Sequence, residues 1–284
     1  MGWLRDRVFG AAAKLLTAPH NSYELYQPND LESLRLLIRK GDIVLVEGNQ
    51  RVSEVIKYLT QSMWSHAAIY VGDEPSQRYP TQRAALESEH GEDAAHLVIE
   101  ALMDTGVTLS PISKYTEYNL RICRPRGLQV DHLTRILDEV LAQVGFQYDL
   151  KNVLDLFRLF FPLSLIPKRF RRTALDFGSG LTKEVICSSM IALAFQNVGY
   201  PIMPSLTPLS EAPPKRQLLD RLRRIRHPYP AIFSRRNPRV LTPRDFDLSP
   251  YFDIVKFNGV EAEHFDYRRI RWADEVVGQR KGVS

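Results

Sequence analysis

The stretch "SHAAIYVGD", from Ser65 to Asp73, decides the fold that the sequence predicts. Its middle, Ala67 to Val71, is small, β-branched or aromatic, and Gly72 and Asp73 form a turn signal, so we expect a buried strand. His66 enters this strand from the preceding loop. A histidine there is either a hydrogen-bonded structural residue or a group that transfers protons. The rest of the sequence has to decide between these two roles.

The neighbouring segments predict further strands and helices. Strands are expected over Asp42 to Glu47, His96 to Leu102 and Asn119 to Arg124, so four strands lie close together in the sequence. Apolar periodicity and end signals predict helices from Asn29 to Gly41, Ser53 to Ser62, Gln129 to Val144 and Thr182 to Val198. The polar segment from Glu74 to Ala95 is expected to be an exposed loop. Together these segments predict an α+β domain with a small, mostly antiparallel sheet.

Bulk composition is that of a globular protein. The chain has 284 residues, 44% of them hydrophobic and 25% charged, which allows one large domain or two small ones. The two cysteines, Cys123 and Cys187, are too few for a disulfide scaffold or a structural zinc site. Lys183 in "FGSGLTKE" stands where a dinucleotide fingerprint needs its third glycine. We therefore expect no metal and no cofactor.

Cys187 lies near the start of the last predicted helix. The helix dipole and unpaired N–H groups there favour the thiolate, the nucleophilic form of cysteine. A small core residue is the alternative, and it is the common fate of a free cysteine. A thiol nucleophile needs a base and a group that orients the base. His66 can supply the base and Glu100 the orienting group, because a carboxylate flanked by the apolar residues of "HLVIEAL" needs a partner.

The order of these motifs resembles that of a known family. The segments "KGDIVLVEG", "SHAAIYVGD", "VIEALMDTGV", "GFQYD" and "VICSSMIALAFQNVGYP", from about Gly41 to Pro201, are similar to circularly permuted papain-like hydrolases. These are permuted relatives of the NlpC-type cell-wall peptidases, often labelled YiiX/YebB-like. The later "LTPRDFDLSPYF" resembles the segment that closes the fold in that family.

The resemblance implies both a fold and a site. The fold would be α+β and permuted papain-like, with the sheet packed against the helix that carries the nucleophile. Cys187 would be the nucleophile, His66 the base and Glu100 the orienting group. Tyr148 of "GFQYD" would lie near the thiol and bind substrate, or it is a packed tyrosine after a helix end.

The resemblance also divides the chain. We expect a helical extension over residues 1–40, the hydrolase domain over 41–206 with an apolar and basic insertion at 150–181, and a basic, proline-rich wrap over 207–284. The N-terminal residues lack the apolar core of a secretion signal. We therefore expect a cytoplasmic protein, with a peripheral position at the inner membrane as the alternative.

Charge is concentrated in one segment. Between Lys215 and Arg244 the chain has ten lysines and arginines and one acid, Asp220, within a net charge of +5. This segment is either a solvated face or a surface for an anionic partner. Because it lacks nucleic-acid-binding motifs, we expect no nucleic acid as partner. An anionic membrane is a candidate partner, through this segment and the N-terminal helix.

The sequence predicts a thiol-dependent hydrolase that works through an acyl-enzyme on Cys187. The substrate would be a peptide-like amide or an acyl lipid, and the reaction that of an amidase, a peptidase or an ester or thioester hydrolase. The alternatives are a lipid acyltransferase at the membrane surface and a non-catalytic, membrane-associated scaffold on the same fold.

Overall fold

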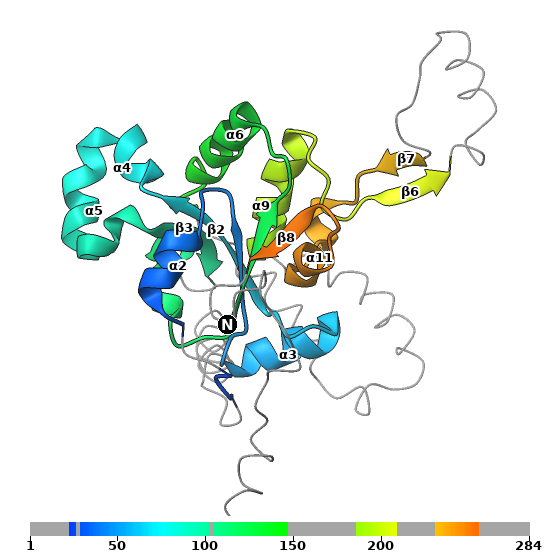
Figure 1. Ribbon diagram of the computed structural model, residues 1–284, viewed down its shortest axis with the longest axis horizontal. Helices are drawn as coiled ribbons and strands as arrows, with labels where there is room; N and C mark the ends of the chain where they lie inside the picture. Colours follow the sequence, from blue (N-terminus) through cyan, green and yellow to red (C-terminus); the bar gives the residue numbers. More distant parts are fainter. Residues whose placement is uncertain (1–22, 27–28, 103–104, 147–185, 209–230, 256–284) are drawn as a thin grey trace, which may run out of the picture.

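The computed structural model describes residues 23–26, 29–102, 105–146, 186–208 and 231–255 (Figure 1). Its main sheet has six strands in the order β4-β3-β2-β1-β5-β8, and every neighbouring pair is antiparallel. The strands are β1 (Ile43–Val46), β2 (His66–Gly72), β3 (Leu97–Leu102), β4 (Gly106–Pro111), β5 (Leu120–Pro125) and β8 (Phe252–Val255). The predicted α+β fold with a mostly antiparallel sheet is thus confirmed. The strands β4 and β8 go beyond the four that the sequence predicts.

Four longer helices agree with the predicted ones, although the bounds of α2, α3 and α6 differ from the predicted bounds by one to four residues. They are α2 (Leu31–Leu37), α3 (Arg51–Thr60), α6 (Val130–Leu141) and α9 (Ile186–Asn197). In α2 the side chain of the N-cap residue Asp30 accepts a hydrogen bond from the backbone N–H of Ser33, which satisfies one N–H of the first turn. This helix ends at Leu37, before the predicted end at Gly41.

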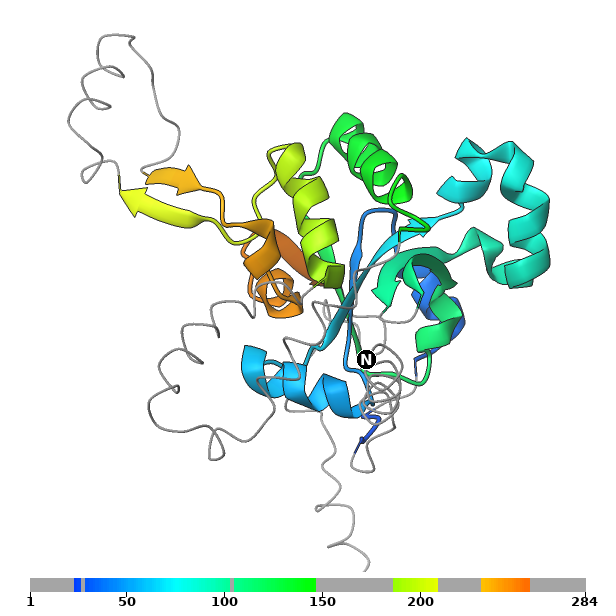
Figure 2. The same cartoon turned by 180° about the vertical axis from the view of Figure 1, so that it is seen from behind.

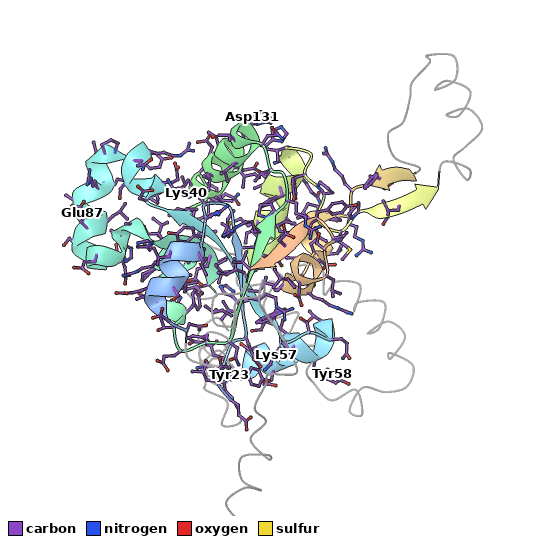
Figure 3. The ribbon with its side chains drawn as sticks, in the orientation of Figure 1. Tyr23, Lys40, Lys57, Tyr58, Glu87 and Asp131 are labelled. Carbon is purple, nitrogen blue, oxygen red and sulfur yellow. The ribbon has the colours of Figure 1, made fainter. Side chains whose placement is uncertain are left out.

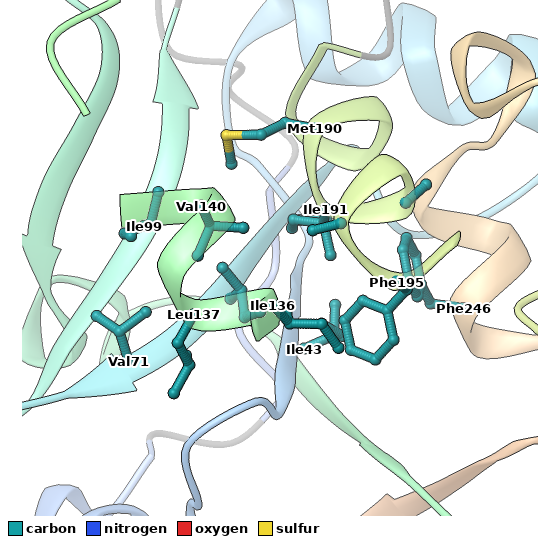
Figure 4. Packing of buried hydrophobic residues seen from close by; sticks show 14 of the residues in the cluster. Ile43, Val71, Ile99, Ile136, Leu137, Val140, Met190, Ile191, Phe195 and Phe246 are labelled. Carbon is teal, nitrogen blue, oxygen red and sulfur yellow. The ribbon is translucent and has the colours of Figure 1, made fainter. Parts of the chain in front are cut away.

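The helices α6 and α9 cover one face of the sheet. Alternate residues of the strands point to this face, so Ile43, Ile69 and Ile99 share one core cluster with the apolar sides of both helices (Figure 4). Ile191 and Phe195 of α9 are fully buried in this cluster. Helix α9 is therefore held against the middle strands of the sheet by apolar packing.

The other face of the sheet carries α2 and the short 3₁₀ helix η3 (Ile112–Tyr115). Ala68 and Tyr70 of β2 and Val98 of β3 point to this side, where they pack with Leu34 of α2 and Ile112 of η3. The second core is smaller than the first. It matters for the site because it places η3 beside β3.

The prediction of an exposed loop from Glu74 to Ala95 is wrong. The segment is helical and contains α4 (Glu74–Arg78), η1 (Pro80–Gln82), α5 (Arg83–His90) and η2 (Gly91–Ala95). Ion pairs four residues apart, Arg78 with Glu74 and Arg83 with Glu87, fit the helical spacing. Leu86 is only 8% exposed and packs in the main core cluster, so this mostly polar segment is attached to the domain by a buried leucine.

The C-terminal part of the described chain returns to the main sheet. Helix α11 (Pro243–Asp247) begins with a capping box of Thr242 and Asp245, and Phe246 is fully buried. Strand β8 then pairs with β5, and the 3₁₀ helix η7 (Pro238–Val240) precedes α11. Strands β6 (Ser205–Pro208) and β7 (Ala231–Ser234) form a separate two-stranded ribbon that projects from the main sheet (Figures 1 and 2).

Among the helices of the described residues, none is long and apolar enough to cross a membrane. The predicted N-terminal helix, the insertion at 150–181 and residues 215–230 of the basic segment lie outside the described residues.

Candidate active site

His66 and Glu100 meet on one face of the sheet. His66 is the first residue of β2, and Glu100 lies in the neighbouring strand β3. Strand alternation puts His66 on the side of Ala68, and Glu100 on the side of Val98, which is the face that α2 and η3 cover. The His66 Nε2 atom lies 2.8 Å from Oε2 of Glu100. The structure therefore brings together two of the three predicted catalytic residues.

Glu100 is a completely buried carboxylate, 0% exposed. Besides the contact with His66, Oε2 of Glu100 accepts a hydrogen bond from the hydroxyl of Tyr115. Its other oxygen, Oε1, accepts a hydrogen bond from the ammonium group of Lys114 at 2.6 Å. Burial alone would raise the pKa of the Glu100 carboxyl. The hydrogen bond and charge of His66, together with Lys114, outweigh burial and hold this pKa well below its usual range.

The charge state of Glu100 sets the proton positions on His66. An ionised carboxylate only accepts hydrogen bonds, so Nε2 of His66 is the donor in their contact. In the neutral ring the lone pair is then on Nδ1. Any proton that His66 takes from a nucleophile therefore goes to Nδ1.

Cys187 is the second residue of α9. Residue 186 is the first described residue of this part of the chain, so Cys187 lies next to the point where the description of α9 begins. The Cys187 side chain lies outside the described residues, as does Tyr148. The next residue, Ser188, is fully buried and donates its hydroxyl to the carbonyl of Leu241, 2.8 Å away, so this part of α9 is tied to the chain before α11.

The position of α9 restricts how Cys187 can approach His66. The helix packs on the face of the sheet opposite to the one that carries His66 and Glu100. A contact between the thiol and the ring has to form around the end of β2, where His66 is the first residue. The predicted pairing of Cys187 with His66 stays a prediction.

Cys123 has a different setting. It lies in the middle of β5, within the strand predicted from Asn119 to Arg124, and it is fully buried. Burial, with a smaller contribution from the charge of Asp247, raises the pKa of its thiol to about 12. Such a thiol is protonated near neutral pH and is a poor nucleophile.

The loop before His66 is anchored by residues that sequence reasoning missed. The indole Nε1–H of Trp64 donates to Oδ2 of Asp247 at 3.0 Å. Arg121 forms an ion pair with the same carboxylate and lies over the Trp64 ring, 5.1 Å from its centroid. Because Asp247 is 183 positions from Trp64, no local pattern could have indicated this contact.

Lys114 and Tyr115 were missed for the same kind of reason. They follow a strand in "PISKYTEY", which has no recognisable motif.

In the part of the chain that the structure describes, no group of three histidine, cysteine or acidic residues is arranged to hold a metal ion.

Comparisons with known proteins found a similar solved structure and a matching family model. A crystal structure titled "metalloprotein yiiX from Escherichia coli O157:H7, DUF1105" is similar, with 15% identity, 77% of this chain and 96% of that chain covered, and a TM-score of 0.41. No curated protein matches this chain. A family model described as "Permuted papain-like amidase enzyme, YaeF/YiiX, C92 family" matches residues 37–160.

The match with the family model agrees with the sequence-based resemblance and supports a cysteine hydrolase as the kind of function. The matched segment contains His66, Glu100, Lys114 and Tyr115, and it ends before Cys187. Over residues 37–160, which are less than half of the chain, this protein is similar to the permuted papain-like amidases.

Proposed function

We propose that the protein is a cysteine amidase in which Cys187 is the nucleophile, His66 the general base and Glu100 the group that orients His66. The observation that carries the proposal is the hydrogen bond between Nε2 of His66 and the fully buried carboxylate of Glu100. A buried carboxylate on a histidine at a strand end is the arrangement that a thiol nucleophile requires. The sequence supplies the remaining element, because it predicts a helix from Thr182 to Val198 with Cys187 near its start, where a thiolate is favoured.

The proposed reaction proceeds through an acyl-enzyme. Nδ1 of His66 takes the proton of the Cys187 thiol, and the thiolate forms a bond to the amide carbonyl carbon. The backbone N–H of Cys187 donates to the resulting oxyanion. The tetrahedral intermediate collapses, the C–N bond breaks, and His66 returns the proton to the leaving amine. Water, deprotonated by His66, then hydrolyses the thioester and restores the thiol.

The proposed substrate is a peptide-like amide, since the family model is described as an amidase. An acyl lipid is the competing substrate, and an acceptor other than water would turn hydrolysis into acyl transfer. Electrophilic probes with peptidyl and with long acyl groups distinguish the two substrate classes. Labelling of Cys187 by the peptidyl probe at a rate above that of the acyl probe supports the amidase.

Selective alkylation tests the nucleophile. We expect iodoacetamide to modify Cys187 between about pH 6 and 7, where an unperturbed thiol with a pKa of about 8.5 is only a few per cent ionised. Cys123 should stay unmodified in the folded protein, because it is fully buried. Peptide mass mapping separates the two cysteines.

Variants of the base provide the control. His66→Ala should slow the alkylation of Cys187 by about tenfold or more near neutral pH, but not at pH 10, where any accessible thiol is ionised. Glu100→Gln should give an intermediate rate, since His66 is still present but less well oriented. The proposal is wrong if Cys187 reacts no faster than a model thiol, or if His66→Ala leaves its rate unchanged.

A further inference from the structure

Lys114 and Tyr115 are charged and polar residues that the proposed mechanism does not use. Both lie in η3, and both contact Glu100, the residue that binds His66. The carboxylate is therefore shared by three donors from two elements. Oε2 accepts from His66 and Tyr115, and Oε1 accepts from Lys114. This division uses both oxygens and leaves the carboxylate one orientation in which all three contacts are made.

The three contacts also balance charge. Glu100 is 0% exposed, and the side chain of Lys114 is 37% exposed, so the ion pair joins a buried anion to a cation that reaches solvent. A buried carboxylate whose only partner is a histidine holds that histidine as a cation, because an unmatched buried charge is costly. With Lys114 as the counter-ion, His66 can be neutral and act as a base.

Other contacts fix η3 in place. Ile112 is fully buried, and its backbone N–H donates to the carbonyl of His96 at 2.9 Å. The Ser113 hydroxyl donates to Asp93 at 2.5 Å, and Asp93 pairs with Arg35 of α2. Two of the three donors on Glu100 thus come from an element that is itself held by other contacts, and such support is what a precise site requires.

We propose that Lys114 and Tyr115 are positioning residues of the active site, which hold the Glu100 carboxylate turned toward Nε2–H of His66 and match its charge. They act through Glu100 and His66, so that His66 exchanges protons at Nδ1. The inference rests on the proposed function, since it gives these residues their role through His66.

The carboxyl titration of Glu100 tests the inference without an activity assay. We follow the side-chain ¹³C shift of Glu100 by NMR from about pH 8 down to the lowest pH at which the protein stays folded, with Glu100→Gln to assign the signal. In the wild type the signal should stay that of the ionised carboxylate until the acid end of this range, because the pKa of Glu100 lies well below its usual range. Lys114→Met should move the acid onset of the titration curve, and with it the midpoint, up by about one pH unit or more, a tenfold change in the protonation equilibrium. Tyr115→Phe should move the curve in the same direction, and Lys114→Arg should restore the wild-type curve. The ring titration of His66 should also move upward in Lys114→Met, because a nearby cation is lost.

Two matched variants act as controls. Lys40→Met removes a lysine that pairs with Asp73 and Glu74, close to Gly72 at the other end of β2 from His66 (Figure 3). Tyr70→Phe removes a hydroxyl of the same core cluster, which contacts His96 instead of Glu100. Neither should move the Glu100 midpoint, whereas a general loosening of the fold would move it in all four variants.

Alkylation of Cys187 at about pH 6.5 separates this inference from the proposed function. It should fall about tenfold in Lys114→Met and in Tyr115→Phe, the effect of losing a hydrogen bond to a charged group. An unchanged Glu100 midpoint in both variants overturns the inference, whatever the alkylation rates. A shifted midpoint with an alkylation rate that does not respond to His66→Ala overturns the proposed function and leaves the contacts of Lys114 and Tyr115 with Glu100 as a structural feature.

Discussion

Glu100 shows how a single residue links stability to the site. A fully buried carboxylate that lost its donors would be an uncompensated charge, and breaking such a pair typically costs about 3–5 kcal/mol. Here His66, Lys114 and Tyr115 compensate the charge, so the same contacts that stabilise the fold also orient the histidine.

Glu100 should make the stability of the protein depend on pH in one direction. Its pKa is lower in the folded state than the value of about 4.3 expected in the unfolded chain. Its contribution is therefore complete above that unfolded pKa and is lost as the pH falls through the lower folded pKa. Urea unfolding at about pH 7, 5 and 3.5 measures this. The stability difference between wild type and Glu100→Gln should be constant from pH 7 to 5 and shrink at pH 3.5.

A difference that is independent of pH over the whole range would contradict the ionised state of Glu100 in the folded protein. Asp253→Asn is the control, since the Asp253 side chain is 52% exposed and its ion pair with Arg126 is accessible to solvent.

At the scale of elements, the short helix α11 holds the loop that leads to His66. Phe246 is buried in the main core, and the neighbouring Asp247 accepts from Trp64 and pairs with Arg121. A five-residue helix has little stability of its own, so tertiary packing must keep it folded.

Truncation of Phe246 tests the packing of α11. Phe246→Ala should destabilise the protein by about 3–5 kcal/mol, because it removes a large, fully buried side chain and leaves a cavity. Leu248→Ala is the matched control, since Leu248 is 55% exposed and its truncation should stay within about 0.5 kcal/mol. Equal effects of the two variants in denaturant unfolding would show that α11 is not anchored by Phe246.

At the scale of the whole molecule, part of the basic segment follows the projecting ribbon. The described part of the basic segment includes Arg235 and Arg236, both exposed, after the strand β7 of the projecting ribbon (Figure 2). The proposed membrane partner concerns this segment, over residues 215–244.

Vesicle sedimentation tests that proposal. The full chain should bind vesicles that contain anionic lipid more than neutral ones at low salt, because each basic residue near such a surface contributes about 1 kcal/mol. Replacing Arg223 and Arg224 by glutamate should reduce binding. Arg83→Glu, at an arginine with a 67% exposed side chain in α5, is a control that should not. Equal binding to both vesicle types would leave the segment as a solvated face.

Much of the fold follows from local sequence. The strand around His66, the strand that contains Cys123 and the helices α6 and α9 are encoded by the alternation and periodicity of neighbouring apolar residues. The need of Glu100 for a partner also follows, since an acid between apolar neighbours in a strand has to be paired when it is buried.

Only the tertiary structure decided the rest. The helices between Glu74 and Ala95 depend on the burial of Leu86 and on ion pairs, which polar composition does not reveal. The partners of Glu100 in η3 and the contact of Trp64 with Asp247 depend on which strands pair and which element covers each face. Local sequence determines whether a residue lies in a strand or a helix, because the backbone repeat involves only near neighbours. Which distant side chain it meets depends on the packing of the whole chain, so Lys114 and Tyr115, the residues that hold Glu100 in place, could be found only in the folded structure.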